Sequence, residues 1–75
     1  MWIAEYRERL IFLDGFETFD NVEKREFPDY LIAHKYLLDT YSLEDEGEYV
    51  EPTNETTIDG EKIKAIRHSV RIYKT

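Results

Sequence analysis

Two Asp-Gly dipeptides, at residues 14–15 and 59–60, constrain the fold of this chain more than any other feature. Each dipeptide joins two segments that have the side-chain pattern of β-strands, and the alternation of apolar and polar residues is clearest in the first and last of these segments. Asp-Gly is the favoured two-residue type I′ turn, because both central residues of that turn need a positive φ angle. The sequence therefore predicts two β-hairpins, one at each end of the chain.

The first hairpin begins with residues 2–13, where an apolar face alternates with a charged one. A two-residue loop sets Leu10 opposite Phe19, which places two apolar side chains on the same face of the hairpin. Asp20-Asn21 interrupts the second strand with two residue types that strands disfavour. We therefore expect a β-bulge at this point of the second strand.

A helix is predicted between the two hairpins. Phe27-Pro28-Asp29 favours its start, because proline and aspartate are both favourable at the first turn of a helix, and the pattern runs to about Tyr41. We expect its apolar stripe, at spacings of three and four, to pack on the sheet. Ile32 and Tyr36 lie off this stripe and are expected on the outer surface. The stripe comprises Tyr30, Ala33, His34, Leu37, Leu38 and Tyr41.

The order of elements predicts a single small α+β domain spanning residues 1–75, β-β-α-β-β, with an antiparallel four-stranded sheet and one helix packed on one face. The apolar content of 41% includes eleven aromatic residues, enough to form a core. The strand order is left open by the pattern. The expected core residues are Trp2, Tyr6, Leu10, Phe12, Phe19, Leu31, Leu37, Leu38, Ile66, Val70 and Ile72.

The net charge of −7 is unevenly distributed along the chain. Residues 39–61 contain nine acidic side chains and no basic one, whereas residues 62–75 contain five basic side chains and no acidic one. In the second hairpin these two blocks adjoin, so one interpretation is that they neutralise each other across the strands. The pairs set by a two-residue loop at residues 59–60 are Glu55 with Lys64, Glu51 with His68, and Glu48 with Arg71.

A negative patch survives this pairing. Such a patch attracts basic protein surfaces and selects partners. With the nearby apolar residues Ile32 and Tyr36, it predicts a non-enzymatic interaction protein that binds and inhibits or modulates a host protein with a basic, nucleic-acid-binding surface, as a nucleic-acid mimic does. Small acidic proteins encoded by phages and mobile elements act in this way as a class. The carboxylates without a basic neighbour are Glu44, Asp45, Glu46 and Asp59.

The first of two alternatives rests on the other sheet face. If the first and last strands are neighbours, four arginines converge there with a tyrosine for base stacking, which favours a small nucleic-acid-binding module. The net charge opposes binding of a polyanion. The second alternative is a structural homodimer that buries exposed apolar residues, either Ile32 and Tyr36 on the outer helix or Ile63, Ala65 and Tyr73 on the outer sheet face. The residues of the nucleic-acid alternative are Arg7, Arg9, Arg67, Arg71 and Tyr73.

The sequence does not indicate an enzyme. It has no glycine-rich phosphate loop and no nucleophile-elbow context around a serine. His34 and His68 are predicted to face the core, with Glu8 as the one further candidate metal ligand, so we expect neither a metal site nor a cofactor. The absence of cysteine, of an export signal and of a membrane-spanning run predicts a cytoplasmic protein that makes no membrane contact.

Overall fold

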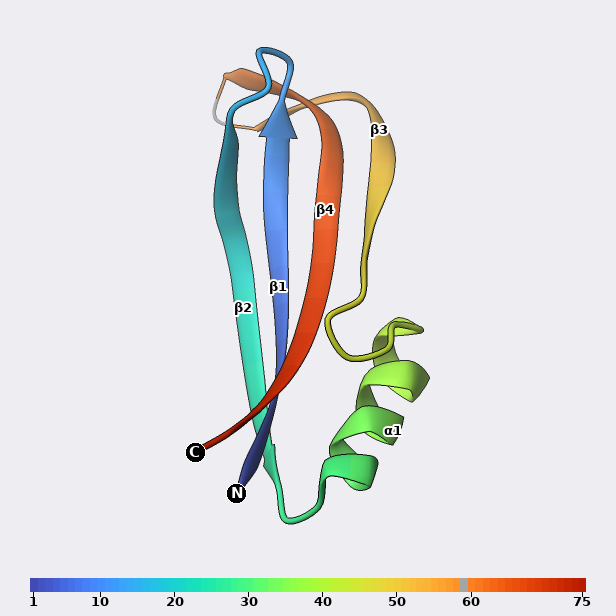
Figure 1. Cartoon of the computed structure of the whole chain (residues 1–75). Coiled ribbons are helices and arrows are strands. Elements are labelled where there is room, and N and C mark those ends of the chain that lie inside the picture. The colour runs from blue at the N-terminus through green and yellow to red at the C-terminus, as the bar shows by residue number, and fades with distance from the viewer. Residues whose placement is uncertain (59) are drawn as a thin grey trace.

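The chain forms a four-stranded antiparallel sheet and one helix, as predicted, in the order β-β-α-β-β. The strand order is β2-β1-β4-β3, so the first and last strands lie side by side in the middle of the sheet (Figure 1). The α+β class is therefore confirmed and the strand order is resolved. The elements are β1 (Trp2–Phe12), β2 (Glu17–Phe27), α1 (Tyr30–Tyr41), β3 (Glu48–Ile58) and β4 (Glu61–Lys74).

The computed structural model describes residues 1–58 and 60–75. Within these ranges, the side chains of residues 19, 20, 54–58 and 61 are not described. Asp59, one of the predicted partner-binding residues, lies outside the described residues.

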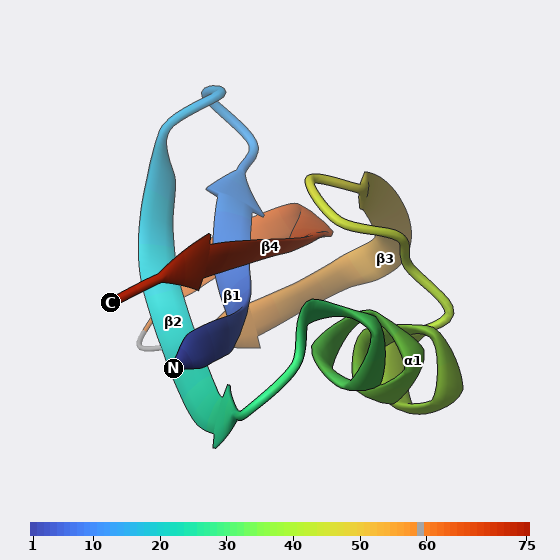
Figure 2. The same cartoon turned by 60° about the horizontal axis from the view of Figure 1, so that its bottom comes forward.

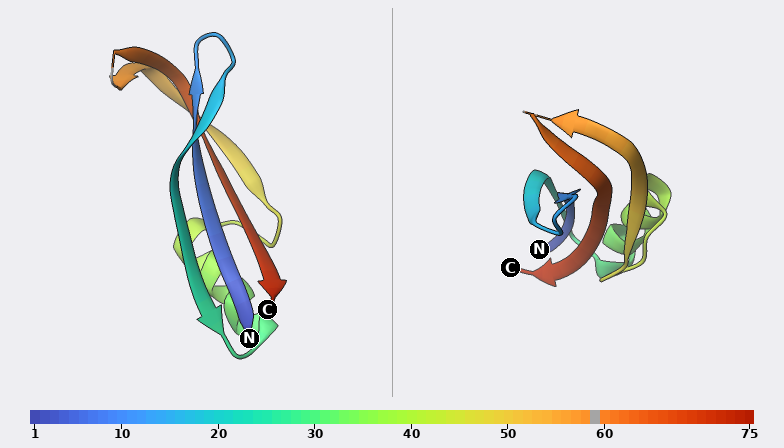
Figure 3. Two further views of the ribbon diagram at one scale, coloured as in Figure 1. Left: turned by 90° about the vertical axis from the view of Figure 1, so that its left-hand side faces the viewer. Right: turned by 90° about the horizontal axis from the view of Figure 1, so that it is seen from above.

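The helix covers only one end of the sheet. The molecule is 42 Å long, whereas a helix of 12 residues at 1.5 Å per residue is about 18 Å long. The helix α1 contacts β1, β2 and β4 at the end where both chain termini lie (Figures 1 and 2). Farther from the helix the strands twist and the two hairpin tips diverge, as Figure 3 shows. Both faces of the sheet therefore keep surface that α1 does not cover.

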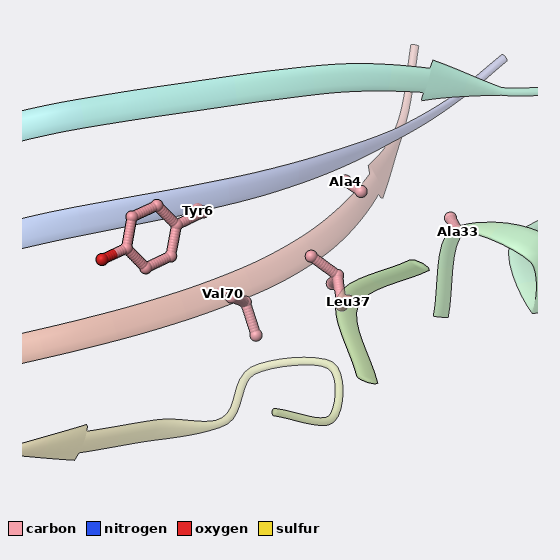
Figure 4. Close-up of a cluster of buried hydrophobic side chains, with 5 residues drawn as sticks. All are labelled: Ala4, Tyr6, Ala33, Leu37 and Val70. Atoms are coloured by element: carbon pink, nitrogen blue, oxygen red, sulfur yellow. The ribbon is translucent and has the colours of Figure 1, made fainter. Parts of the chain in front are cut away.

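The main core lies where α1 meets the sheet. Ala33 and Leu37 are fully buried and pack against side chains of β1 and β4, which come from residues two apart and therefore from one face (Figure 4). Asp29 caps the helix, since its carboxylate accepts a hydrogen bond from the Leu31 backbone N–H at 2.7 Å. The helix start was thus predicted correctly. The buried cluster is Ala4, Tyr6, Ala33, Leu37 and Val70.

The predicted core is wrong at two helix positions. Leu31 is 72% exposed and Leu38 is 37% exposed. The buried stripe of the helix is narrow and consists of Ala33 and Leu37, so Leu31 and Leu38 lie outside it. Of the others, Tyr6, Leu10, Leu37 and Val70 are buried, whereas Trp2, Phe12, Ile66 and Ile72 are half-buried. The side chain of Phe19 is outside the described residues.

The first hairpin closes by a three-residue loop rather than the predicted type I′ turn. The backbone N–H of Phe12 donates to the carbonyl of Phe16 at 2.8 Å, and only Gly15 in this loop has a positive φ angle, 91°. The Asp14 carboxylate accepts a hydrogen bond from the Phe16 N–H at 2.9 Å. A side-chain-stabilised turn followed by a left-handed glycine is the usual three-residue hairpin loop, and it explains the difference.

The longer loop displaces the pairing near the turn by one residue. Leu10 lies opposite Thr18, so the predicted pairing with Phe19 is wrong. The register shifts between Glu8 and Arg9, opposite the segment that contains Asp20. The predicted β-bulge is confirmed there, and beyond it the register is the one that the two-residue loop predicts.

The second hairpin has the predicted register only beside its turn. Ile58 pairs with Glu61, as a two-residue loop requires, but the register shifts by two residues between Pro52 and Thr56. Proline has no N–H for the ladder, so a break at this edge strand is expected. As a result Glu48 lies opposite Ser69, and the predicted pairing of Glu48 with Arg71 is wrong. Because the shift is an even number of residues, Glu48 and Glu51 stay on the sheet faces predicted for them.

Candidate binding surfaces

The acidic loop that follows α1 is anchored by one of its own carboxylates. Asp45 Oδ1 accepts a hydrogen bond from the Ile72 backbone N–H at 2.7 Å, and Oδ2 accepts one from the Tyr30 hydroxyl at 3.0 Å. The hydrogen bond to Asp45 raises the pKa of Tyr30. Asp45 therefore fastens the loop to the helix and to β4, and its contact with a partner stays a prediction.

The predicted acidic patch is smaller than its composition suggests. Glu44 and Glu46 are both exposed. Glu46 lines a pocket on the sheet face opposite α1, so it points to a different side of the molecule from the helix. Among the described members of the predicted patch, Glu44 is the exposed one that follows most closely after the helix end.

The outer side of α1 carries exposed apolar residues. Ile32 is 52% exposed, as predicted, and Leu31 and Leu38 accompany it. Tyr36 differs from the prediction, because its ring packs edge-on against Phe27 with the centroids 5.1 Å apart. Leu31 and Leu38 are seven residues apart on either side of Lys35, a spacing that could have predicted a shared outer face. We define the outer helix surface as Leu31, Ile32, Lys35, Leu38 and Asp39.

The structure brings the predicted arginines together, because β1 and β4 are neighbours. Arg9 lies directly opposite Arg67, and Arg7 lies opposite Ser69. Arg67 donates to Glu17 at 2.9 Å and to Glu48 at 3.0 Å. The hydrogen bond from Arg67 holds the pKa of Glu17 below its ordinary value. Arg67 is thus matched by two carboxylates rather than left to attract a polyanion.

Glu5 lies on the same sheet face as these arginines and is fully buried. Its Oε1 accepts hydrogen bonds from the Nε of Arg71 at 2.9 Å and the Nε of Arg7 at 2.6 Å, while Oε2 lies 3.6 Å from the Lys24 ammonium. The Tyr73 hydroxyl donates to Oε2 at 3.4 Å. Burial raises the pKa of Glu5, but the two arginines outweigh it and the net shift is downward.

This role of Glu5 was missed in the sequence. The residue stands on the charged parity of β1, which predicts an exposed carboxylate. Its pairing with Arg71 on a central strand could have indicated the ion pair, but only once β1 and β4 were known to be adjacent.

His68 belongs to a chain of polar side chains on the helix side of the sheet. Its Nδ1 lies 2.6 Å from the Tyr6 hydroxyl, and its Nε2 lies 3.1 Å from Glu51. Tyr6 also reaches Glu8 at 3.3 Å. The ring of His34 stacks against a tyrosine of its own helix. Among the side chains that the structure describes, no group of three or more His, Asp or Glu residues is placed to hold a metal ion.

The geometry defines a small α+β protein with one partly exposed helix and a sheet face of paired charges. Comparison with family models, with curated proteins and with solved structures finds no match to this chain. In the part of the chain that the structure describes, no helix has the length and apolar character needed to span a bilayer.

Proposed function

We propose that this chain is a non-enzymatic interaction protein whose outer helix surface, with Glu44 beside it, binds a basic surface of another protein. In this proposal it is a phage or mobile-element protein that acts in the cytoplasm and inhibits a host protein by covering a site that otherwise holds nucleic-acid phosphates. The observation that carries the proposal is Leu31, an aliphatic side chain that is 72% exposed in the first turn of α1.

Apolar burial supplies the attraction in this proposal. Leu31, Ile32 and Leu38 would leave water on binding, and each fully buried aliphatic side chain contributes about 1.5–3 kcal/mol. This is enough for specific association only if the partner supplies a matching apolar groove and the costs of immobilisation are met. The three side chains are therefore the expected energetic centre of the interface.

Charge supplies the selection of the partner. Asp39 lies on the outer helix surface, Glu44 follows the helix end, and the whole chain carries a net charge of −7. A field of this sign accelerates association with basic proteins and disfavours nucleic acid. The arginine face supports nucleic-acid binding less well, since Arg67 is already paired with two carboxylates, Glu17 and Glu48.

The test is capture of one binding protein by the immobilised chain at low salt, compared among matched variants. We expect Leu31→Asp and the double variant Asp39→Lys/Glu44→Lys to lose the captured protein, and raised salt to weaken capture by the wild type. Phe16→Asp is the matched control, because Phe16 is also largely exposed, at 64%, but lies at the far hairpin tip, and it should retain capture.

The outcomes separate the alternatives. Retained capture by Leu31→Asp, with an unchanged melting temperature, would refute the outer helix surface as the binding site. A concentration-dependent mass in light scattering that Leu31→Asp abolishes would assign the same surface to a homodimer instead.

A further inference from the structure

An open pocket of about 240 Å³ lies on the sheet face opposite α1. At about 30 Å³ per water molecule, it has room for a group of several heavy atoms, such as a phosphate. It lies on a different side of the molecule from the outer helix surface and plays no part in the function proposed above. The side chains that line it include Glu5, Arg7, Arg9, Glu46, Ser69 and Arg71.

The pocket is lined by three arginines and two carboxylates, so its lining carries an excess of positive charge. The single buried carboxylate of Glu5 is shared by Arg7, Arg71 and Lys24, at 2.6, 2.9 and 3.6 Å. Three cations around one anion leave a local positive field, although the whole chain is acidic. A second anion beside these guanidinium groups would reduce their mutual repulsion.

Glu5 also orients the two arginines. Both use Nε to donate to the same oxygen, Oε1, which fixes the planes of the two guanidinium groups next to each other. A planar guanidinium held in this way loses little freedom when it binds an oxyanion. Arg71 packs over the Tyr73 ring, 4.6 Å from its centroid, which restrains it further.

We propose that this pocket binds a small oxyanion, inorganic phosphate or a phosphate monoester, between Arg7 and Arg71. Ser69, which pairs with Arg7 on the neighbouring strand, offers a hydroxyl donor. Glu5 is a positioning residue that holds the arginines, and Glu46 at the rim is a competing anion. A small anion fits better than a nucleic-acid strand, because the adjoining Arg67 is neutralised by two carboxylates.

The test is a titration of the intact chain with inorganic phosphate, followed by the amide and arginine Nε signals in NMR spectra at neutral pH and constant ionic strength. We expect saturable shifts at Arg7, Ser69 and Arg71. Arg71→Gln should weaken binding about tenfold, the usual effect of losing one charge-assisted hydrogen bond. Glu46→Gln should strengthen it by removing a like charge, and Arg25→Gln, an exposed arginine on the helix side, should not change it.

Three results would overturn the proposal. The first is that chloride produces the same shifts as phosphate at the same ionic strength. The second is that Arg71→Gln binds phosphate as tightly as the wild type and keeps the wild-type melting temperature. A single-stranded oligonucleotide could bind in an Arg71-dependent manner while phosphate does not, which would assign the face to nucleic acid. A nucleoside monophosphate added in parallel shows whether the anion is free phosphate or an ester.

Discussion

Replacement of Glu5 by glutamine tests the main electrostatic feature of this fold. The carboxylate is fully buried on a central strand and receives hydrogen bonds from Arg7, Arg71 and Tyr73. The amide of glutamine has nearly the same shape but no charge, and it turns one acceptor into a donor that faces cations. The variant therefore leaves Arg7, Arg71 and Lys24 without their shared counter-ion.

The cost can be bounded from the geometry. Removal of one partner from a buried ion pair costs about 3–5 kcal/mol. Because the side chains of Arg7 and Arg71 are 33% and 50% exposed, water screens part of this loss, and we expect about 2–3 kcal/mol. A domain of 75 residues has about 4–11 kcal/mol of total stability, so the melting temperature should fall by about 10–20 °C.

The assay is thermal and urea unfolding followed by circular dichroism, repeated as a function of pH. Because the folded-state pKa of Glu5 lies below its ordinary value of 4.5, its contribution is complete above that pH and is lost as the pH falls through the lowered pKa. The difference between wild type and Glu5→Gln should therefore disappear in acid. A variant within about 0.5 kcal/mol of the wild type at neutral pH would refute the reasoning.

Three further substitutions test the packing and the turns. Leu37→Ala removes the fully buried contact between α1 and the sheet and should cost about 2–5 kcal/mol in urea unfolding, whereas an unchanged midpoint would mean that the helix is not docked. Asp45→Ala leaves the Ile72 N–H without its acceptor and the Tyr30 hydroxyl without its partner, and should cost about 1–3 kcal/mol, with faster amide exchange at Ile72 as the direct readout. Gly15→Ala meets no steric contact but is strained at a φ angle of 91°, so it should lower stability by about 1–2 kcal/mol in the same assay, and a neutral result would contradict the left-handed loop.

The sequence by itself determined the elements and their faces. The Asp-Gly dipeptides, the alternation in β1 and β4, and Pro28-Asp29 at the helix start are local signals, and the structure contains two hairpins and a helix where these signals predict them. Turn and cap geometry depends on neighbouring residues only, so it can be inferred from a few positions. Even the bulge near Asp20 follows from the poor strand propensity of its residues.

The binding surfaces depended on the tertiary structure, because they are made by residues far apart in the chain. Glu5 meets Arg71 only when β1 and β4 are neighbours, and several strand orders satisfy the same alternation equally well. Leu31 is exposed because the helix packs on the sheet through Ala33 and Leu37, which lie on the opposite side of the helix from Leu31. Asp45 accepts a hydrogen bond from the backbone N–H of Ile72, which is 27 residues away in the chain, and no pattern in the sequence indicates this contact. The local alternation of residues determines the sheet face on which a side chain lies. Packing between distant segments determines which residues that side chain contacts.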